Sequence, residues 1–226
     1  MRQRPFLPKQ SHISSPERQV KVQFPPVSKS PLLWFCLALL GAVGLAVLSP
    51  AERTLGTNVR IVYLHGAWVW VALASFLAAA LTGLIGLIFH HERIQRWSRA
   101  LGRTGLFFWI TYLPISMWAM QTNWNGLFLV EPRWRLALIF AIGGVLMQVG
   151  VALVEDPAWA SAANVVYFIA LILALTNTEN VMHPPAPILA SNAWRIQLFF
   201  AGLVLLMLLA AGQFARWLFH FERRKA

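Results

Sequence analysis

The chain has 226 residues, of which 58% are hydrophobic and only 12% are charged. A water-soluble domain usually carries about 25% charged residues, so this composition excludes an ordinary soluble protein and fits a surface that faces lipid. The net charge of +11 would suit a nucleic-acid partner, but the basic residues lie in short stretches between long apolar runs, which argues against nucleic acid and is typical of cytoplasmic loops in membrane proteins.

The apolar runs predict an all-α membrane protein. Residues 1 to about 30 are polar, rich in Pro, Ser, Lys and Arg, and show no helical periodicity, so we expect a flexible cytoplasmic tail. A helix needs about 20 apolar residues to cross the hydrocarbon core. The remaining segment, 31–226, is expected to form one domain of six transmembrane helices, over residues 31–48, 66–89, 105–120, 136–154, 160–176 and 196–219.

The orientation of the chain follows from its lysine and arginine residues, which are enriched in cytoplasmic segments. Fourteen of them fall in the N-terminal tail, in the loop expected at about 90–103 and at the C-terminal end, and five fall in the alternate segments. We therefore expect both termini in the cytoplasm. Three external segments follow, at about 49–65, 121–135 and 177–195.

Histidines are the candidate metal ligands, because a single cysteine excludes an internal disulfide and a Cys-only metal site. His65 and His183 are far apart in the sequence, yet both are expected at the external membrane face. Two neutral imidazoles at one level can hold a metal from opposite sides, and histidine is a frequent ligand of haem iron. Two unrelated interfacial histidines would give the same pattern.

The external segment NWNGLFLVEPRWR carries large rings and basic groups. Trp124 and Phe128 are typical of the aromatic belts found at the water boundary of membrane proteins. Arg133 and Arg135 are unusual on this side of the membrane, where Arg60 is also expected. Such a cluster of guanidinium groups suits carboxylates or phosphates, such as haem propionates or anionic lipid headgroups.

These features together resemble the haem-handling membrane proteins of c-type cytochrome biogenesis, in particular the haem exporter protein C (CcmC) type. Short members of that family have six spans, a histidine before the second span, a tryptophan-rich external loop after the third and a histidine before the sixth. His65 in RIVYLHGAWVW and His183 look like the two histidines, and WNGLFLVEPRWRL looks like the family's WGxxWxWDxR loop. The resemblance covers about residues 56–205.

The loop is a degenerate version of the family's pattern. Trp124 matches its first tryptophan, Glu131 stands at the aspartate and Arg133 matches the arginine, whereas Asn125 replaces a glycine and Val130 a tryptophan. In the family this loop is understood to hold the haem edge and to present it to a periplasmic chaperone. The loss of rings therefore predicts weaker presentation of haem, without affecting the two histidines.

The resemblance implies a non-enzymatic, multi-pass protein of the cytoplasmic (inner) membrane that binds haem b transiently at the outer face. Its implied partners are membrane lipid, a periplasmic haem chaperone and other cytochrome c maturation subunits. Since the chain has no GxxxxGK[ST] motif, an ABC-type ATPase complex would supply any ATP hydrolysis. The implied axial ligands are His65 and His183, and the implied haem contacts are Trp124, Phe128, Glu131, Arg133 and Arg135.

Two other functions stay open on the sequence. The same histidines could hold haem b in a membrane-anchor subunit for electron transfer, although such ligands usually lie within spans. Alternatively, the degenerate loop could belong to a haem-free paralogue that serves as a structural subunit of a transporter.

Overall fold

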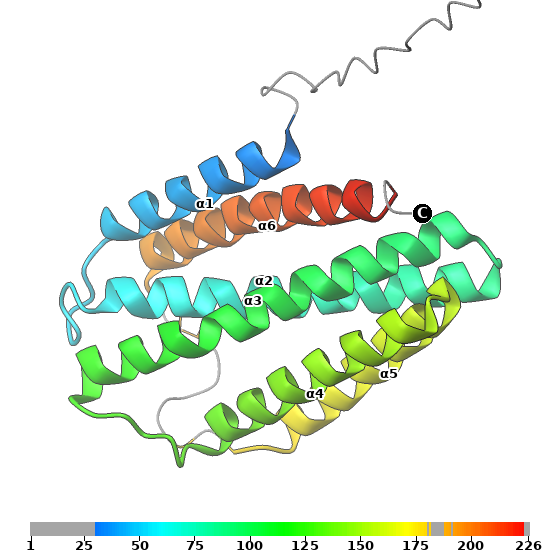
Figure 1. Ribbon diagram of the computed structural model, residues 1–226. Coiled ribbons are helices and arrows are strands. Elements are labelled where there is room, and N and C mark those ends of the chain that lie inside the picture. Colours follow the sequence, from blue (N-terminus) through cyan, green and yellow to red (C-terminus); the bar gives the residue numbers. More distant parts are fainter. Residues whose placement is uncertain (1–29, 180, 182–187, 191, 224–226) are drawn as a thin grey trace, which may run out of the picture.

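The computed structural model describes residues 30–179, 181, 188–190 and 192–223, and it confirms the all-α class (Figure 1). The predicted tail covers residues 1 to about 30, and residues 1–29 of it lie outside the described part of the chain. The six helices of the described part are α1 (Pro31–Val47), α2 (Val59–Ile88), α3 (Glu92–Trp124), α4 (Pro132–Val154), α5 (Pro157–Thr176) and α6 (Trp194–Arg223).

The helices form three antiparallel pairs that lie side by side. In Figure 1 the α2–α3 hairpin occupies the middle, with α1 and α6 above it and α4 and α5 below it. The buried core follows the α2–α3 hairpin and includes Trp68, Phe76 and Trp109. The ends of the helices therefore fall into two groups, one beside the α2–α3 turn and one at the opposite end of the bundle.

Four of the described helices, α2, α4, α5 and α6, are long and apolar enough to cross a membrane. Their surfaces carry many exposed large hydrophobic side chains, such as Leu146, Leu153 and Val166, which is what a lipid-facing surface requires. This arrangement defines a multi-pass membrane protein. α1 is apolar but has only 17 residues, and α3 is long but carries charges in its first third.

The second helix begins earlier than its apolar run indicated. It starts at Val59 rather than near residue 66, because Val59, Ile61 and Tyr63 are buried in the core and hold the preceding turn in helical form. The predicted external segment 49–65 is therefore shorter than expected. His65 lies inside α2 and not before it.

The prediction of a loop at about 90–103 is wrong, because α3 already begins at Glu92. The turn between α2 and α3 is short, and its His90 has the left-handed φ of 51°. Two polar side chains pull the start of α3 onto α2: Gln95 Nε2 donates to Gly86 O at 3.0 Å, and Ser98 Oγ donates to Ala79 O at 2.7 Å. The arginines of this segment consequently lie on a helix.

A polar junction joins α2, α3 and α5 at the level of Ser98. Asn164 Nδ2 donates to Ser98 O at 2.9 Å and to Ser98 Oγ at 3.0 Å, and all these groups are buried. Small residues permit the close approach of the helices, since a Cβ atom at Gly83 would lie 3.0 Å from Ser161 O. Interhelical hydrogen bonds and small residues are the usual source of helix association in a membrane.

We expect Asn164→Ala to lower the stability of the bundle by about 1–2 kcal/mol, because it removes two interhelical hydrogen bonds and leaves a void. The change is measured as the midpoint of thermal unfolding in detergent. Thr82→Ala is the matched control, since the Thr82 hydroxyl bonds only to carbonyls of its own helix. Equal midpoints for both variants would contradict the role of the junction.

Candidate functional site

His65 lies on α2 near the end of the bundle opposite the α2–α3 turn. It follows the first helical residue, Val59, by six positions, which places it about 9 Å inside the helix end. Its side chain is half-buried, and its ring centroid is 5.3 Å from that of Tyr112 on α3, at an interplanar angle of 45°. The imidazole is therefore held within the helix bundle and not at its edge.

Arg133 on α4 lies at nearly the same depth as this ring pair. Trp109 Nε1 on α3 donates to Ala137 O on α4 at 3.0 Å, which fixes the relative level of the two antiparallel helices. Tyr112 lies about one turn beyond Trp109, and Arg133 lies one turn before Ala137, so both are displaced toward the same end.

The Arg133 side chain joins the start of α4 to the end of α5. It is half-buried, and it donates from Nε to Thr178 O and from Nη2 to Leu175 O, both at 3.3 Å. The last carbonyl groups of a helix lack partners within the helix and carry partial negative charge. The guanidinium therefore stabilises the end of α5 and fixes the position of the chain that follows it.

Glu131 holds the same segment one step further along the chain. It is buried, with 8% of its surface exposed, and its Oε1 accepts a hydrogen bond from the Val181 backbone N–H at 3.3 Å. Glu131 and Arg133 thus both bind the segment between α5 and α6. His183, the other predicted ligand, follows Val181 by two residues and lies outside the described residues.

The remaining predicted contacts are more exposed. Trp124 is the last residue of α3 and Phe128 lies in the loop that follows, and each has 37% of its surface exposed. Arg135 is exposed and donates from Nε to Leu129 O of the same loop at 3.3 Å. The structure therefore places the ring pair of His65 and Tyr112 at about the same level as Arg133. It leaves Trp124, Phe128 and Arg135 more exposed, at the end of α3, in the loop that follows and on α4.

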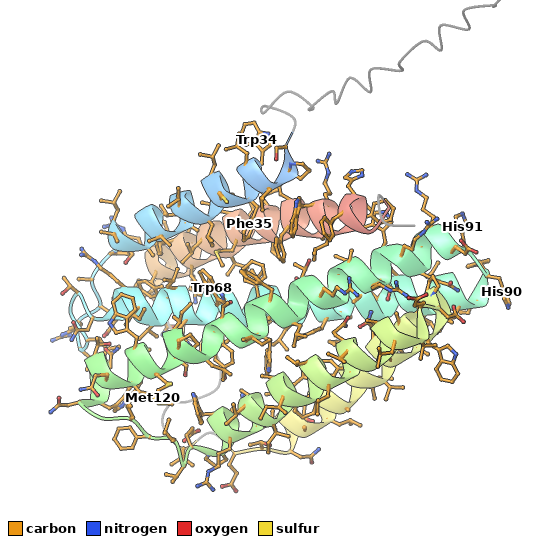
Figure 2. The ribbon with its side chains drawn as sticks, in the orientation of Figure 1. Trp34, Phe35, Trp68, His90, His91 and Met120 are labelled. Carbon is orange, nitrogen blue, oxygen red and sulfur yellow. The ribbon has the colours of Figure 1, made fainter. Side chains whose placement is uncertain are left out.

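The other described histidines lie elsewhere. Figure 2 shows His90 and His91 at the turn between α2 and α3, at the opposite end of the bundle from Met120. No three His, Cys, Asp or Glu side chains within the described segments come close enough to hold a metal ion. A metal bound through one or two protein ligands, as in haem, is the type of site that His65 suits.

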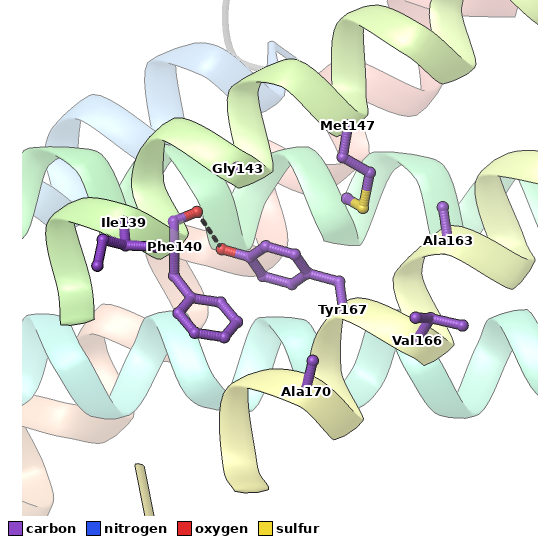
Figure 3. Close-up of a pocket in the computed structure, with 8 residues that line it drawn as sticks. All are labelled: Ile139, Phe140, Gly143, Met147, Ala163, Val166, Tyr167 and Ala170. Atoms are coloured by element: carbon purple, nitrogen blue, oxygen red, sulfur yellow. Dashed lines mark hydrogen bonds between the residues drawn. The ribbon is translucent and has the colours of Figure 1, made fainter. Parts of the chain in front are cut away.

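A shallow pocket of about 390 Å³ lies between α4 and α5 (Figure 3). Its lining is almost entirely apolar, with Ile139, Met147 and Val166 among the side chains. The Tyr167 hydroxyl at its wall already donates to Phe140 O at 2.8 Å. The pocket contains none of the predicted site residues, so it is separate from the His65 region.

Sequence reasoning missed Tyr112 and the carbonyl groups of Leu175 and Thr178. A tyrosine within an apolar run is a signal for a polar contact inside the bundle, and Tyr112 could have been singled out for that reason. The backbone carbonyls carry no such signal, because every residue has one. Their role depends on the packing of α4 against α5.

The fold and this region define a multi-pass all-α membrane protein with a histidine held among aromatic and charged side chains near one end of its bundle. No family model matches the chain. Over 107 residues, 47% of the chain, it is 25% identical to a Marchantia polymorpha protein described as a ccmC-like mitochondrial protein of cytochrome c biosynthesis. The match covers 46% of that relative, so the chain spans about half of its length. The chain is thus distantly similar to a ccmC-like protein, as its motifs indicated.

Proposed function

We propose that this chain is a haem-binding membrane subunit of c-type cytochrome biogenesis, which holds haem b near the external face and hands it to a chaperone. The observation that carries the proposal is that His65 and the segment leading to His183 lie at the same end of the bundle. Glu131 and Arg133, which match the acid and the arginine of the family's loop, both bind that segment at the same end of the bundle.

The position of His183 in the sequence supports its role as the second axial ligand. It follows Val181 by two residues. Val181 is itself bonded to Glu131, one turn or less from Arg133. His65 and His183 would hold the iron from its two sides, and the iron would supply reversible ligand exchange.

The charged groups around His65 are suited to the propionates of haem. The Arg133 guanidinium has five N–H groups and uses two of them on the end of α5, so others are left for a carboxylate. Arg135 and the rings of Trp124 and Phe128 would contact the exposed edge of the porphyrin. Glu131 would act by holding the backbone in place, because its carboxylate is buried against Val181.

We further propose that all six helices cross the cytoplasmic membrane, with both termini in the cytoplasm. Residues 104–123 of α3 contain no charged side chain and span about 30 Å, the thickness of the hydrocarbon core. α1 is apolar throughout its 17 residues, which gives it a length of about 26 Å. This orientation places His65 near the external face, where a periplasmic chaperone could receive haem.

Within this function the chain would carry out no covalent chemistry. It would bind haem, orient it toward the external side and release it, so its affinity must be moderate. Transfer to the chaperone would involve other maturation subunits, and an ABC-type ATPase complex would provide energy from ATP. The exposed positions of Trp124 and Phe128 would leave the haem edge accessible to the acceptor.

The absorption spectrum of the detergent-purified protein tests this function. The wild type is expected to show a Soret band and the α and β bands of reduced low-spin haem, because two imidazoles give a low-spin iron. His65→Ala and His183→Ala are each expected to lose these bands or to convert them to a high-spin spectrum. His90→Ala is the matched control at the other end of the bundle and should leave the spectrum unchanged.

Unchanged spectra in both ligand variants would refute the assignment of the ligands. The complete absence of a Soret band from the wild type, expressed with ample haem, would favour the haem-free structural subunit. The degenerate loop, with Val130 in place of a ring, is the observation behind that alternative.

One structural observation favours the electron-transfer alternative. His65 lies within α2, about 9 Å from its end, and ligands within spans are the usual arrangement in membrane-anchor cytochromes. An anchor subunit would retain its haem and show a reversible midpoint potential. A biogenesis subunit would lose its haem to a soluble apo-acceptor within minutes, so measuring the transfer of Soret absorbance separates the two functions.

A further inference from the structure

A line of arginines follows one face of α3 on the side of the α2–α3 turn. Arg96, Arg99 and Arg103 are three and four residues apart, so their side chains leave the helix within a narrow arc. Arg103 Nε donates to Gln148 Oε1 on α4 at 3.4 Å, which shows that this arc faces the neighbourhood of α4. On another face of α3, Trp97 stacks on Phe219 of α6 with ring centroids 4.5 Å apart.

Two guanidinium groups of this face, those of Arg96 and Arg99, carry N–H groups that find no acceptor in the described part of the chain. Nε and Nη2 of Arg99 and Nε of Arg96 are buried and make no hydrogen bond within the described part of the chain. Arg96 lies 4.0 Å from Glu92, and no described carboxylate lies within that distance of Arg99. Charged groups that lose water need a partner of opposite charge. Nη1 of Arg99 is not among these buried atoms, so an anion that approaches from the surface can reach the guanidinium at that nitrogen.

The depth of these side chains is that of lipid phosphates. The uncharged stretch 104–123 spans about 30 Å and fills the hydrocarbon core, so Arg103 lies at its boundary. Arg99 lies one turn further out, about 6 Å beyond Arg103. The headgroup layer on each side of the core is about 5–8 Å thick, so both guanidinium groups lie within it.

The same face of α3 becomes apolar where the hydrocarbon begins. Phe107, Ile110 and Pro114 follow Arg103 at four, seven and eleven residues, which keeps them on its side of the helix. Phe107 is half-buried, and Ile110 and Pro114 are exposed. Figure 1 shows α3 in front of the other helices, between the α1–α6 pair and the α4–α5 pair. The ring of Phe107 packs against Phe214 of α6 at a centroid distance of 4.7 Å, so the exposed part of this face lies at Ile110 and Pro114.

We propose that this face of α3 is a binding site for an anionic phospholipid. The phosphate accepts hydrogen bonds from Arg99 and Arg103, and the acyl chains lie along Phe107, Ile110 and Pro114. Guanidinium groups bind phosphate through paired N–H donors. A free phosphate ion would satisfy the arginines but not the apolar continuation of the face, which is why a lipid is the better match.

The acidic residues nearest to this end of the bundle do not replace the lipid. Glu155 and Asp156 form the turn between α4 and α5, and both are exposed. Asp156 Oδ1 accepts a hydrogen bond from Ala158 N at 2.8 Å and so caps α5. The proposal depends on the membrane placement of α3 and not on haem, so it can fail while the proposed function holds.

Native mass spectrometry of the full chain, titrated with phosphatidylglycerol or phosphatidylcholine, tests the site. Each basic group near an anionic surface contributes about fivefold in affinity. The wild type should therefore bind phosphatidylglycerol at least fivefold more tightly than phosphatidylcholine. Arg99→Gln with Arg103→Gln should reduce that preference to less than twofold. Equal affinity of the wild type for both lipids would overturn the proposal.

The matched control is Arg93→Gln with Arg216→Gln, which removes two exposed arginines from the same side of the membrane. This control should keep the preference, and an equal loss in both double variants would show attraction by net charge only and would refute the site. Displacement of the lipid by millimolar inorganic phosphate would show a site for a free anion and would also refute it. If the glutamine variant does not fold, Arg99→Lys with Arg103→Lys should weaken the preference, because lysine lacks the paired donors, and an unchanged preference would count against the site.

Discussion

Gly102→Val is expected to destabilise the protein more than any other single change considered, by about 3 kcal/mol. A Cβ atom at Gly102 would lie 2.8 Å from the Asn164 side-chain carbon Cγ and within contact of its amide oxygen and nitrogen. Asn164 cannot move away without breaking its hydrogen bonds to Ser98. The variant should therefore separate α5 from α3, and it should unfold at a lower temperature in detergent.

Gly212→Val on α6 is the control for this substitution. A Cβ atom at Gly212 would meet nothing within 4 Å, so the change tests only the helix propensity of the new side chain. The control should unfold within a few degrees of the wild type. Equal unfolding temperatures for the two variants would show that α3 and α5 are not closely packed at Gly102.

Arg133→Ala is expected to have the second largest effect, because it removes two charge-assisted hydrogen bonds from the end of α5. Both bonds are long, at 3.3 Å, and the side chain is only half-buried, so we expect a total loss of about 2 kcal/mol, less than fully buried bonds of this type would give. If Arg133 acts by holding the segment that leads to His183, the variant should show a high-spin spectrum like that of His183→Ala. The Soret band and the thermal midpoint are measured on the same sample.

A double-mutant cycle separates this positioning role from a direct contact with a propionate. In the His183→Ala background, a positioning residue has nothing left to position, so Arg133→Ala should change the haem spectrum and affinity very little. A propionate contact would persist in that background and would give a second, additive loss. Arg135→Ala is the surface control, since Arg135 is exposed and bonds only to its own loop.

The helical class and the number of helices could be predicted from the sequence, because a helix that is surrounded by lipid needs a long run of apolar residues. The helix ends could not. Val59, Ile61 and Tyr63 extend α2 into a segment with basic and polar residues, and they do so because they are buried against other helices. The start of α3 at Glu92 depends in the same way on hydrogen bonds from Gln95 and Ser98 to α2.

The sequence singles out candidate residues for the site but not the contacts that they make. His65, Glu131 and Arg133 are singled out by motif and placement, and the structure places all three toward one end of the bundle. The sequence suggested that Arg133 faces a ligand, whereas its guanidinium binds Leu175 O and Thr178 O. The sequence shows that Arg133 is a hydrogen-bond donor. Which acceptor it binds depends on the packing of α4 against α5.

The hydrogen bonds from Gln95 and Ser98 to the backbone of α2 bear on how the protein enters its membrane. α3 is not among the described helices whose length and composition suit a membrane span, and the side chains of Gln95 and Ser98 find their acceptors on α2. A translocon that released α3 alone would leave these groups unsolvated in lipid. Insertion should therefore proceed by hairpins, with the second helix retained at the translocon until the third has emerged from the ribosome.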